Sequence, residues 1–347
     1  MILPNATRAF RASLLAPERH TNTARALRHQ VLPVASELAV VLCDVPFLGV
    51  APLLPAAVVP RLTVVVRSTG LLHDPAHRER IDFERSGLRY LAAQHGRVAA
   101  ISAYMREHLA RDYGLPAAAL VSLPDGLTPG EWSSSPLRPP PLPPQARGGF
   151  LLALGRAQPY KGWDDLIEAI AALRAAGTRL PHALLAAVTD QPEPTAYQRH
   201  LADHIGQLGL DATLLTRFDP GVRDLLWHPA LRTVVIPSRR EPFGRIPLEA
   251  YVAGAAPVVA TTAGGLAEQV IDGVTGFTAA AADPAHLAGA LRRALASSAG
   301  ERARMRAAGR DLARTRFDHR LAIQRFFAEF APWACRETDG QAGQKPP

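Results

Sequence analysis

The stretch FLLALGRAQPYKGWDDLIEAI, residues 150–170, carries the pattern that decides the fold class. Its apolar run predicts a buried strand that ends at Leu154. A turn opened by Arg156 follows, and Lys161 stands just before a helical pattern with two aspartates in its first turn. A buried strand joined by a short turn to a helix is the repeating unit of parallel α/β folds. We therefore look for further copies of this unit along the chain.

Such units recur in both halves of the sequence. Short apolar runs alternate with helix-like stretches such as WDDLIEAIAALRAAG and PAHLAGALRRALA, which indicates right-handed parallel connections and an α/β class. We expect these runs to be strands: ELAVVLCD, RLTVVV, RVAAIS and ALVSLP in the first half, and FLLALG, ALLAAV, TLLTR, RTVVIP and PVVA in the second.

A proline-rich segment, SSSPLRPPPLPPQARGG, divides these two sets of strands. It favours an extended, stiff spacer, since proline supports neither a helix interior nor a central strand. Two Rossmann-like domains facing across a cleft form a common ligand site. We expect a Rossmann-like N-terminal domain at 1–135, a linker at 136–148, a ligand-binding domain at 149–315, a C-terminal helix at 316–336 that can return to the first domain, and a disordered tail at 337–347.

Composition excludes several classes of protein. The 347 residues are 48% apolar and 20% charged, which is typical of a globular protein. The net charge of +8 is spread along the chain, whereas nucleic-acid binding favours a concentrated basic stripe. Cys43 and Cys335 form no metal or disulfide pattern, so we expect a reducing cytosol. No leader is evident, and prolines interrupt the most apolar window, Val45 to Pro60, so we expect no membrane-spanning helix.

Lysine is rare in this sequence, and the position of Lys161 is therefore informative. It is the only lysine before Lys345 in the tail, although the chain has 37 arginines. Arg156 and Lys161 follow a strand at the carboxyl edge of a predicted parallel sheet, where such folds bind ligands. Together they can neutralise a diphosphate. A plain surface turn with two solvated cations is the alternative.

A second segment, RTVVIPSRREPFGRIPLEAYVAGAAPVVATTAGGLAEQVIDGVTGF, places two glutamates around a turn. A strand leads to Glu241, Gly244 permits close backbone approach, and Glu249 lies in the helix that follows. The unpaired first amides of that helix suit an anion, and carboxylates accept hydrogen bonds from sugar hydroxyls. Gly264 and Glu268 belong to a further turn and predicted helix start. Each glutamate alone also fits a solvated charge at a helix start.

The second half of the chain resembles the retaining glycosyltransferases of family four, which have the GT-B architecture. The residues that carry the resemblance are LGRAQPYKG, EPFGRIPLE, APVVA and AGGLAEQVIDGVTGF, in the family's order and spacing between Phe150 and Leu295. AISAYMREHLARDYGLP and LPDGL extend it loosely into the first half, where Asp125 stands in place of the family's usual asparagine. The resemblance implies sugar transfer from a nucleotide-sugar donor with retention of anomeric configuration, an activity of the hexosyltransferase type within EC 2.4.

The resemblance also implies roles for individual residues. Arg156 and Lys161 would bind the donor diphosphate and stabilise the leaving nucleotide, Glu241 would contact the transferred sugar, and Glu249 the ribose. The remaining expected donor-binding residues are Phe243, Gly244, Arg245, Gly264, Gly265 and Glu268. No protein nucleophile is implied. With two cations and a helix terminus available, we expect no metal and no cofactor, the nucleotide sugar being a substrate.

The first half departs from the family pattern. Its first thirty residues show neither a clear strand nor a glycine-rich loop, and only about four strand candidates precede the linker, so this domain looks shortened. His73, after a predicted strand, is the candidate for the acceptor side, and a plain loop histidine is the alternative. A catalytically silent nucleotide-sugar-binding partner subunit is therefore the alternative function. The acceptor stays open among carbohydrates, lipid-linked sugars and small molecules, with a cytoplasmic location and an optional peripheral contact at the inner membrane face.

Overall fold

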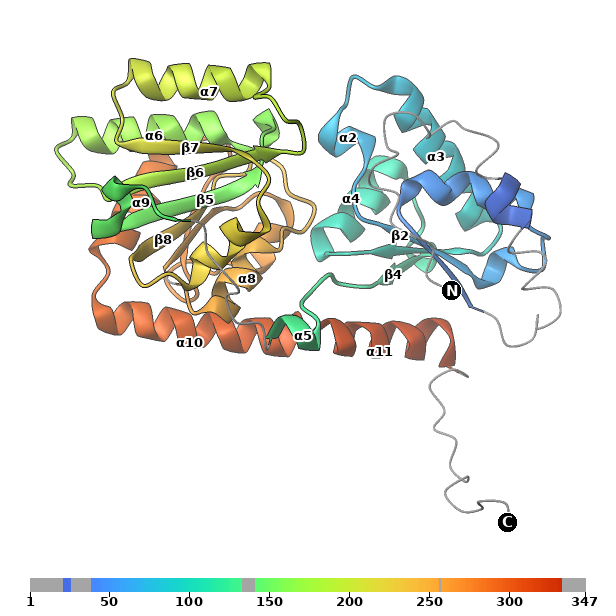
Figure 1. The fold of residues 1–347 in the computed structure, drawn as a ribbon. Helices are drawn as coiled ribbons and strands as arrows, with labels where there is room; N and C mark the ends of the chain where they lie inside the picture. The colour runs from blue at the N-terminus through green and yellow to red at the C-terminus, as the bar shows by residue number, and fades with distance from the viewer. Residues whose placement is uncertain (1–20, 26–38, 133–140, 256, 333–347) are drawn as a thin grey trace, which may run out of the picture. The chain divides into compact units, whose positions relative to one another are not determined.

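The computed structural model describes residues 21–25, 39–132, 141–255 and 257–332, and it divides into two compact units. The first unit comprises Met1–Pro124 and Arg320–Pro347, and the second comprises Asp125–His319. Each unit is built around its own parallel sheet (Figure 1). The predicted class, α/β with two Rossmann-like parts, is thereby confirmed. The tail at 337–347, residues 136–140 of the predicted linker and most of the first thirty-eight residues lie outside the described ranges.

The sheet of the first unit has the order β1-β2-β3-β4, all pairs parallel. Its most buried strand, β2, has no exposed residue, which is typical of a parallel strand covered on both faces. The elements described in this unit are β1 (Val40–Cys43), η3 (Val45–Leu53), η4 (Val59–Arg61), β2 (Leu62–Val66), α2 (Gly70–His73), α3 (Arg78–Ala93), β3 (Arg97–Ala100), α4 (Ala103–Tyr113), η5 (Ala117–Ala119), β4 (Leu120–Ser122) and, from residue 320 on, most of α11 (His319–Phe330).

The sheet of the second unit has the order β10-β9-β8-β5-β6-β7 and is also parallel. The chain builds outward from β5 to β7 and then returns to the other side of β5 with β8. The order of the strands therefore reverses between β5 and β8. The strands are β5 (Phe150–Arg156), β6 (His182–Thr189), β7 (Ala212–Arg217), β8 (Leu231–Ile236), β9 (Val258–Thr261) and β10 (Phe277–Ala279).

Helices cover both faces of this second sheet, as a doubly wound fold requires. Leu151 and Ala153 of β5 share one apolar core with residues of α6, α7 and α9, and the alternate β5 side chains point to the other face. On that other face α8 and α10 pack on each other (Figure 1). The helical elements are α5 (Pro129–Trp132), η6 (Pro144–Gly148), η7 (Pro159–Lys161), α6 (Trp163–Ala175), α7 (Ala196–Gln207), η8 (Pro220–Trp227), α8 (Ile246–Ala253), η9 (Gly264–Glu268), α9 (Pro284–Ala296) and α10 (Ala299–Arg316).

Local sequence explains where these helices begin and end. Thr195 and Gln198 form a reciprocal capping box at the start of α7. Helix α8 has Pro247 in its first turn, where a missing N–H costs nothing, and it ends at Gly254 in the left-handed conformation, φ 70°. Asp164 and Asp165 lie in the first turn of α6, where the helix dipole favours negative charge.

All nine predicted strands are present, and β10 was not predicted. The three residues of β10 are too few for a recognisable apolar run, and among the described strands β10 pairs with β9 alone, at the sheet edge. The proline-interrupted window forms the 3-10 helix η3, which is buried at Val45, Leu48, Val50 and Ala51, and the start of η4, which is buried at Val59. Within the described ranges, no helix combines the length and the apolar character that crossing a membrane demands.

Candidate functional site

The strand order of the second unit places two loops side by side. Ligands bind parallel α/β sheets beyond the carboxyl ends of the strands, at the point where the strand order reverses. Here that point lies between β5 and β8, which are hydrogen-bonded neighbours. Arg156 is the last residue of β5, which runs two residues past the predicted end at Leu154, and Lys161 lies in the loop that follows. The loop after β8 carries Ser238 and Glu241. Two segments eighty residues apart in the sequence thus meet at one sheet edge.

Backbone contacts hold these two loops together. The carbonyl oxygen of Tyr160 accepts hydrogen bonds from the backbone N–H groups of Arg239 at 2.8 Å and Arg240 at 3.3 Å. Gly162 has φ 73°, and a Cβ at this position would lie 1.9 Å from the carbonyl oxygen of Pro237. Only glycine permits both this conformation and this approach. The two loops are therefore one rigid structure.

Lys161 and Glu241 form an ion pair across the two loops. Nζ of Lys161 contacts Oε2 of Glu241, and the two side chains are 14% and 11% exposed. The hydroxyl of Ser238 donates to the same carboxylate oxygen at 3.3 Å. Lys161 Nζ and the Arg156 guanidinium carbon lie 5.7 Å and 5.9 Å from the centroid of the Tyr160 ring. Two cations thus lie close to the Tyr160 ring, and one of them, Lys161, is paired with the Glu241 carboxylate.

A third loop, after β9, packs under the second one. The N–H of Gly265 donates to the carbonyl oxygen of Glu241 at 3.0 Å. Gln269 is fully buried, and its side-chain amide donates to the carbonyl oxygens of Phe243 at 2.7 Å and Gly265 at 3.3 Å. Gly244 has φ 80°, and a Cβ there would lie 2.7 Å from Cγ of Glu241. Gly244 therefore leaves room for the Glu241 side chain, and Gly265 holds the Glu241 backbone.

Glu249 lies in the first turn of α8 between two arginines. Its carboxylate is 3.6 Å from Nε of Arg223 and 3.7 Å from Nε of Arg245. Burial raises the pKa of Glu249, and the two guanidinium groups lower it less than burial raises it. Arg245 also forms an ion pair with Glu131, whose pKa is lowered: burial acts to raise it, but hydrogen bonds from Thr128 and Arg245 outweigh that effect. Glu249 is thus a desolvated carboxylate in the first turn of a helix.

Residues 140–312 match the family model described as "Glycosyl transferases group 1". The matched segment contains all three loops and the reversal of strand order between β5 and β8. Through this segment, the chain belongs to glycosyl transferases group 1.

Among named proteins, a D-inositol 3-phosphate glycosyltransferase from Frankia alni is 38% identical over 153 residues, covering 43% of this chain and 37% of the relative. The protein of the same name from Geodermatophilus obscurus is 34% identical over 219 residues, 60% of this chain and 48% of its own. A glycogen synthase from Mycobacterium tuberculosis H37Rv is 34% identical over 210 residues, 60% and 47%. The chain spans less than half of the length of these curated relatives.

Two solved structures show the fold of the chain as a whole. The Anabaena protein HepE, in complex with UDP, has a TM-score of 0.67 and 22% identity, with 88% of this chain and 82% of that chain covered. Sucrose-phosphate synthase from Thermosynechococcus elongatus has a TM-score of 0.71 and 20% identity, with 93% and 80% covered. These likenesses, with two parallel α/β units, confirm the GT-B fold that the sequence predicted.

Most of the residues singled out from the sequence lie in these three loops of the group 1 segment. Arg156 ends β5 and Lys161 lies in the loop after it, whereas Glu241 to Arg245 follow β8, and Glu249 lies one turn further on. Gly264 and Gly265 belong to η9. Glu268 was expected to start a helix, but it ends that short 3-10 helix, because the chain turns there toward β10.

Three contacts of the site were not expected from the sequence. They are the carbonyl of Tyr160, the side chain of Gln269, and the pair Asp165–Arg239, whose two hydrogen bonds measure 2.7 Å and 2.6 Å. A backbone carbonyl carries no sequence signal, and Gln269 and Arg239 are ordinary polar residues in loops. Only the topology of the sheet brings them to the site.

His73 lies in the first unit, at the end of α2 after strand β2. The start of that short helix is held by Glu84, which is fully buried and accepts both the N–H of Gly70, at 2.8 and 3.0 Å, and Nε of Arg80 at 2.8 Å. The hydroxyl of Tyr113 donates to the same carboxylate. A satisfied buried carboxylate therefore fixes the segment that carries His73.

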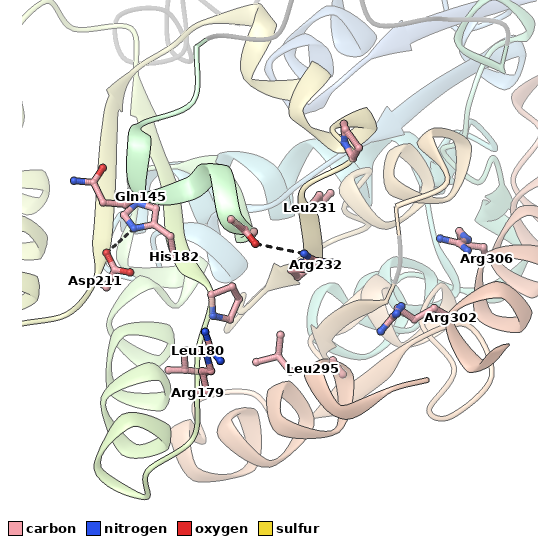
Figure 2. Close-up of a pocket in the computed structure, with 15 residues that line it drawn as sticks. Gln145, Arg179, Leu180, His182, Asp211, Leu231, Arg232, Leu295, Arg302 and Arg306 are labelled. Atoms are coloured by element: carbon pink, nitrogen blue, oxygen red, sulfur yellow. Dashed lines mark hydrogen bonds and ion pairs between the residues drawn. The ribbon is translucent and has the colours of Figure 1, made fainter. Parts of the chain in front are cut away.

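A cavity of about 640 Å³ lies at the opposite edge of the second sheet, near the amino ends of β5, β6 and β8 (Figure 2). His182 lies beside it and is held by Asp211 at 2.7 Å and by the hydroxyl of Thr213 at 2.9 Å. The charged residues that line it include Arg179, Arg232, Arg302 and Arg306. None of the residues predicted to bind the donor lines this cavity.

Proposed function

We propose that the protein is a glycosyltransferase of the hexosyltransferase type, which transfers a sugar from a nucleotide-sugar donor with retention of configuration. The observation that carries this proposal is the Lys161–Glu241 pair at the reversal of strand order in a group 1 segment. The pair puts a cation for the phosphates and a carboxylate for the sugar on adjacent loops. Enzymes of this kind gain most from stabilising the charge that develops on the leaving group.

Each donor group has a counterpart in these loops. Arg156, which is exposed, and Lys161 take the diphosphate, and the backbone amides of Phe243 to Arg245 support it beside the start of α8. Glu241 accepts hydrogen bonds from the transferred sugar, and Gly264, Gly265 and Glu268 line the same region. These groups neutralise the leaving nucleotide without a divalent ion, so we infer a metal-independent donor site. No side chain is assigned as a nucleophile.

Glu249 is the counterpart of the ribose. Its carboxylate is desolvated, has two arginines beyond hydrogen-bond distance, and retains the capacity to accept from a vicinal diol. A ribose that supplies two hydroxyl donors would satisfy it. Because burial disfavours the free carboxylate, part of the affinity for the nucleotide comes from relieving that cost.

UDP-glucose is the donor to test first, since the Anabaena protein of the same fold has been solved with UDP and with UDP-glucose. The relatives' names suggest two acceptors for the first assays, D-inositol 3-phosphate and glycogen. We propose that His73 of the first unit contributes to acceptor binding. Lipid-linked sugars are a further acceptor class, and they would bring with them a peripheral contact with a membrane.

The decisive experiment measures UDP release and product anomeric configuration by NMR with UDP-, GDP- and ADP-glucose and these acceptors. We expect one nucleotide sugar to be turned over, with the α-configuration kept and without added metal. Glu241→Ala and Lys161→Ala should lower kcat/KM by about 10²- to 10³-fold. A catalytically silent partner subunit would instead bind the nucleotide sugar without releasing nucleotide from it. Its cellular role would then be kept in both Glu241→Ala and Lys161→Ala.

A further inference from the structure

Four carboxylate and imidazole side chains lie on the neighbouring helices α6 and α7 of the second unit. Asp164 and Glu168 are one turn apart on α6, and His200 and His204 are one turn apart on α7. Residues four apart share a helix face. The two helices contribute to one apolar core and run next to each other (Figure 1). Each helix thus presents its pair of ligands to the other.

The distances between these groups are short. Nε2 of His200 lies 2.8 Å from Oδ1 of Asp164, and Nε2 of His204 lies 2.9 Å from Oε1 of Glu168. One ligand atom each of Asp164, His200 and His204 falls within 4.8 Å of the others. Two ligands about 2.0–2.2 Å from a common zinc ion are at most about 4.4 Å apart, so small rotamer changes bring all three into coordination range.

We propose that Asp164, His200 and His204 bind a divalent transition-metal ion of the zinc class, with Glu168 or water completing the shell. Two imidazoles and a carboxylate are a ligand set that suits Zn²⁺ and disfavours Mg²⁺ and Ca²⁺, which take oxygen ligands. The ion would replace the direct hydrogen bond between His200 and Asp164. This site has no residue in common with the donor site.

Neighbouring groups orient these ligands. The hydroxyl of Tyr197 donates to Oδ2 of Asp164 at 2.6 Å, which leaves Oδ1 toward the histidines. Such partners outside the ligand shell raise metal affinity by fixing ligand orientation. Nδ1 of His204 is buried and has no hydrogen-bond partner among the described residues. Among the described residues, the ion-pair contact with Glu168 holds the other ring nitrogen, so the ring can turn toward an ion at the cost of that one contact.

The ion would connect α7 to the first turn of α6. That turn follows Gly162 directly. Asp165, the residue after Asp164, forms an ion pair with Arg239 of the loop after β8. A metal that binds only the folded unit stabilises it by mass action. We therefore expect the bound ion to raise the unfolding temperature of the second unit.

The test titrates the chelator-treated full chain with Zn²⁺ in competition with a chromophoric chelator, and with Co²⁺ for its visible absorption. One equivalent of Zn²⁺ should bind and raise the melting temperature. His200→Gln, His204→Gln and Asp164→Asn should each weaken binding by at least about tenfold and abolish the Co²⁺ spectrum of nitrogen and oxygen ligation. Each variant tests one ligand.

The control is His95→Asn, which removes an exposed histidine of the first unit, and asparagine tolerates the positive φ of 60° there. Its Zn²⁺ affinity should match that of the wild type within about twofold. Equal affinity in the wild type and in the His200→Gln/His204→Gln double variant would overturn the proposal. If a variant is less stable without metal, the melting shift on adding Zn²⁺ still decides: it should be lost in the ligand variants and kept in His95→Asn.

Discussion

At the scale of single residues, substitutions in the pair Lys161–Glu241 should affect stability and activity differently. Both side chains are nearly buried, so Lys161→Met leaves the Glu241 carboxylate desolvated without its cation. We expect a loss of about 1–3 kcal/mol in the free energy of unfolding. Adding Glu241→Gln removes the unpaired charge and should recover most of that stability, while kcat/KM stays at least about 10²-fold low. Urea unfolding and donor turnover of the single and double variants measure the two effects; recovery of activity together with stability would contradict a donor role.

A second residue-scale prediction concerns Glu249 and pH. Since burial raises its pKa in the folded state, folding favours the protonated form, and the resulting loss of stability appears as pH rises through that pKa. Glu249→Gln, a neutral isostere, should therefore raise the urea midpoint at neutral pH, and the difference should vanish at acid pH. The same change should weaken nucleotide binding by about tenfold, since a hydrogen bond to the ribose is lost.

Glu301 gives a matched control, because its pKa is shifted in the opposite direction from that of Glu249. The N–H of Ser298 at the start of α10, followed by the serine hydroxyl, lowers the pKa of this exposed carboxyl. Its contribution to stability is present above its unfolded pKa and is lost as pH falls. Glu301→Gln should thus lower the midpoint at neutral pH and leave nucleotide affinity unchanged. Parallel pH profiles for the two variants would contradict the assigned role of burial at Glu249.

At the scale of elements, the junction between β5 and α6 depends on Gly162. Gly162 and Gly177 have nearly the same backbone angle, φ 73° and 75°, but a Cβ would meet the Pro237 carbonyl at 1.9 Å in the first case and nothing within 4 Å in the second. Gly177→Ala should cost about 1–2 kcal/mol for the left-handed conformation alone. Gly162→Ala should cost more and also lower nucleotide affinity, because the loop after β5 must move away from the loop after β8. Equal effects on unfolding and on binding would show that the loops are not coupled.

The elements also show how far the sequence reaches. Most of the nine predicted strands were found because a strand buried on both faces is a nearly continuous apolar run, as in β2 and β6. Strand β7 is only half-buried, but it keeps a short apolar run. Lys161 was singled out by composition, but its contact with Glu241 follows only from β5 and β8 being neighbours. The Gln269 side chain binds backbone carbonyl oxygens, and Tyr160 contributes its own carbonyl oxygen, so neither contact is specified by a residue pattern. The family resemblance named the side chains of the proposed donor site, and the strand order explains why they meet.

At the scale of the whole molecule, the two units have separate sheets and cores, and all residues of the proposed donor site belong to the second. A ligand that binds one folded unit raises the free energy of the opening reactions that permit amide hydrogen exchange there. The increase is at most RT ln(1 + [L]/Kd), about 2.7 kcal/mol at a hundredfold excess over Kd. We expect saturating UDP to protect residues 156–162, 238–249 and 263–269, and to leave strands β1 to β4 unchanged. Hydrogen exchange with mass spectrometry measures both units in one sample, with Lys161→Met as the control that loses protection. Equal protection of the segment around α2 would mean that the nucleotide itself contacts the first unit, and His73 would then be a donor residue instead of an acceptor residue.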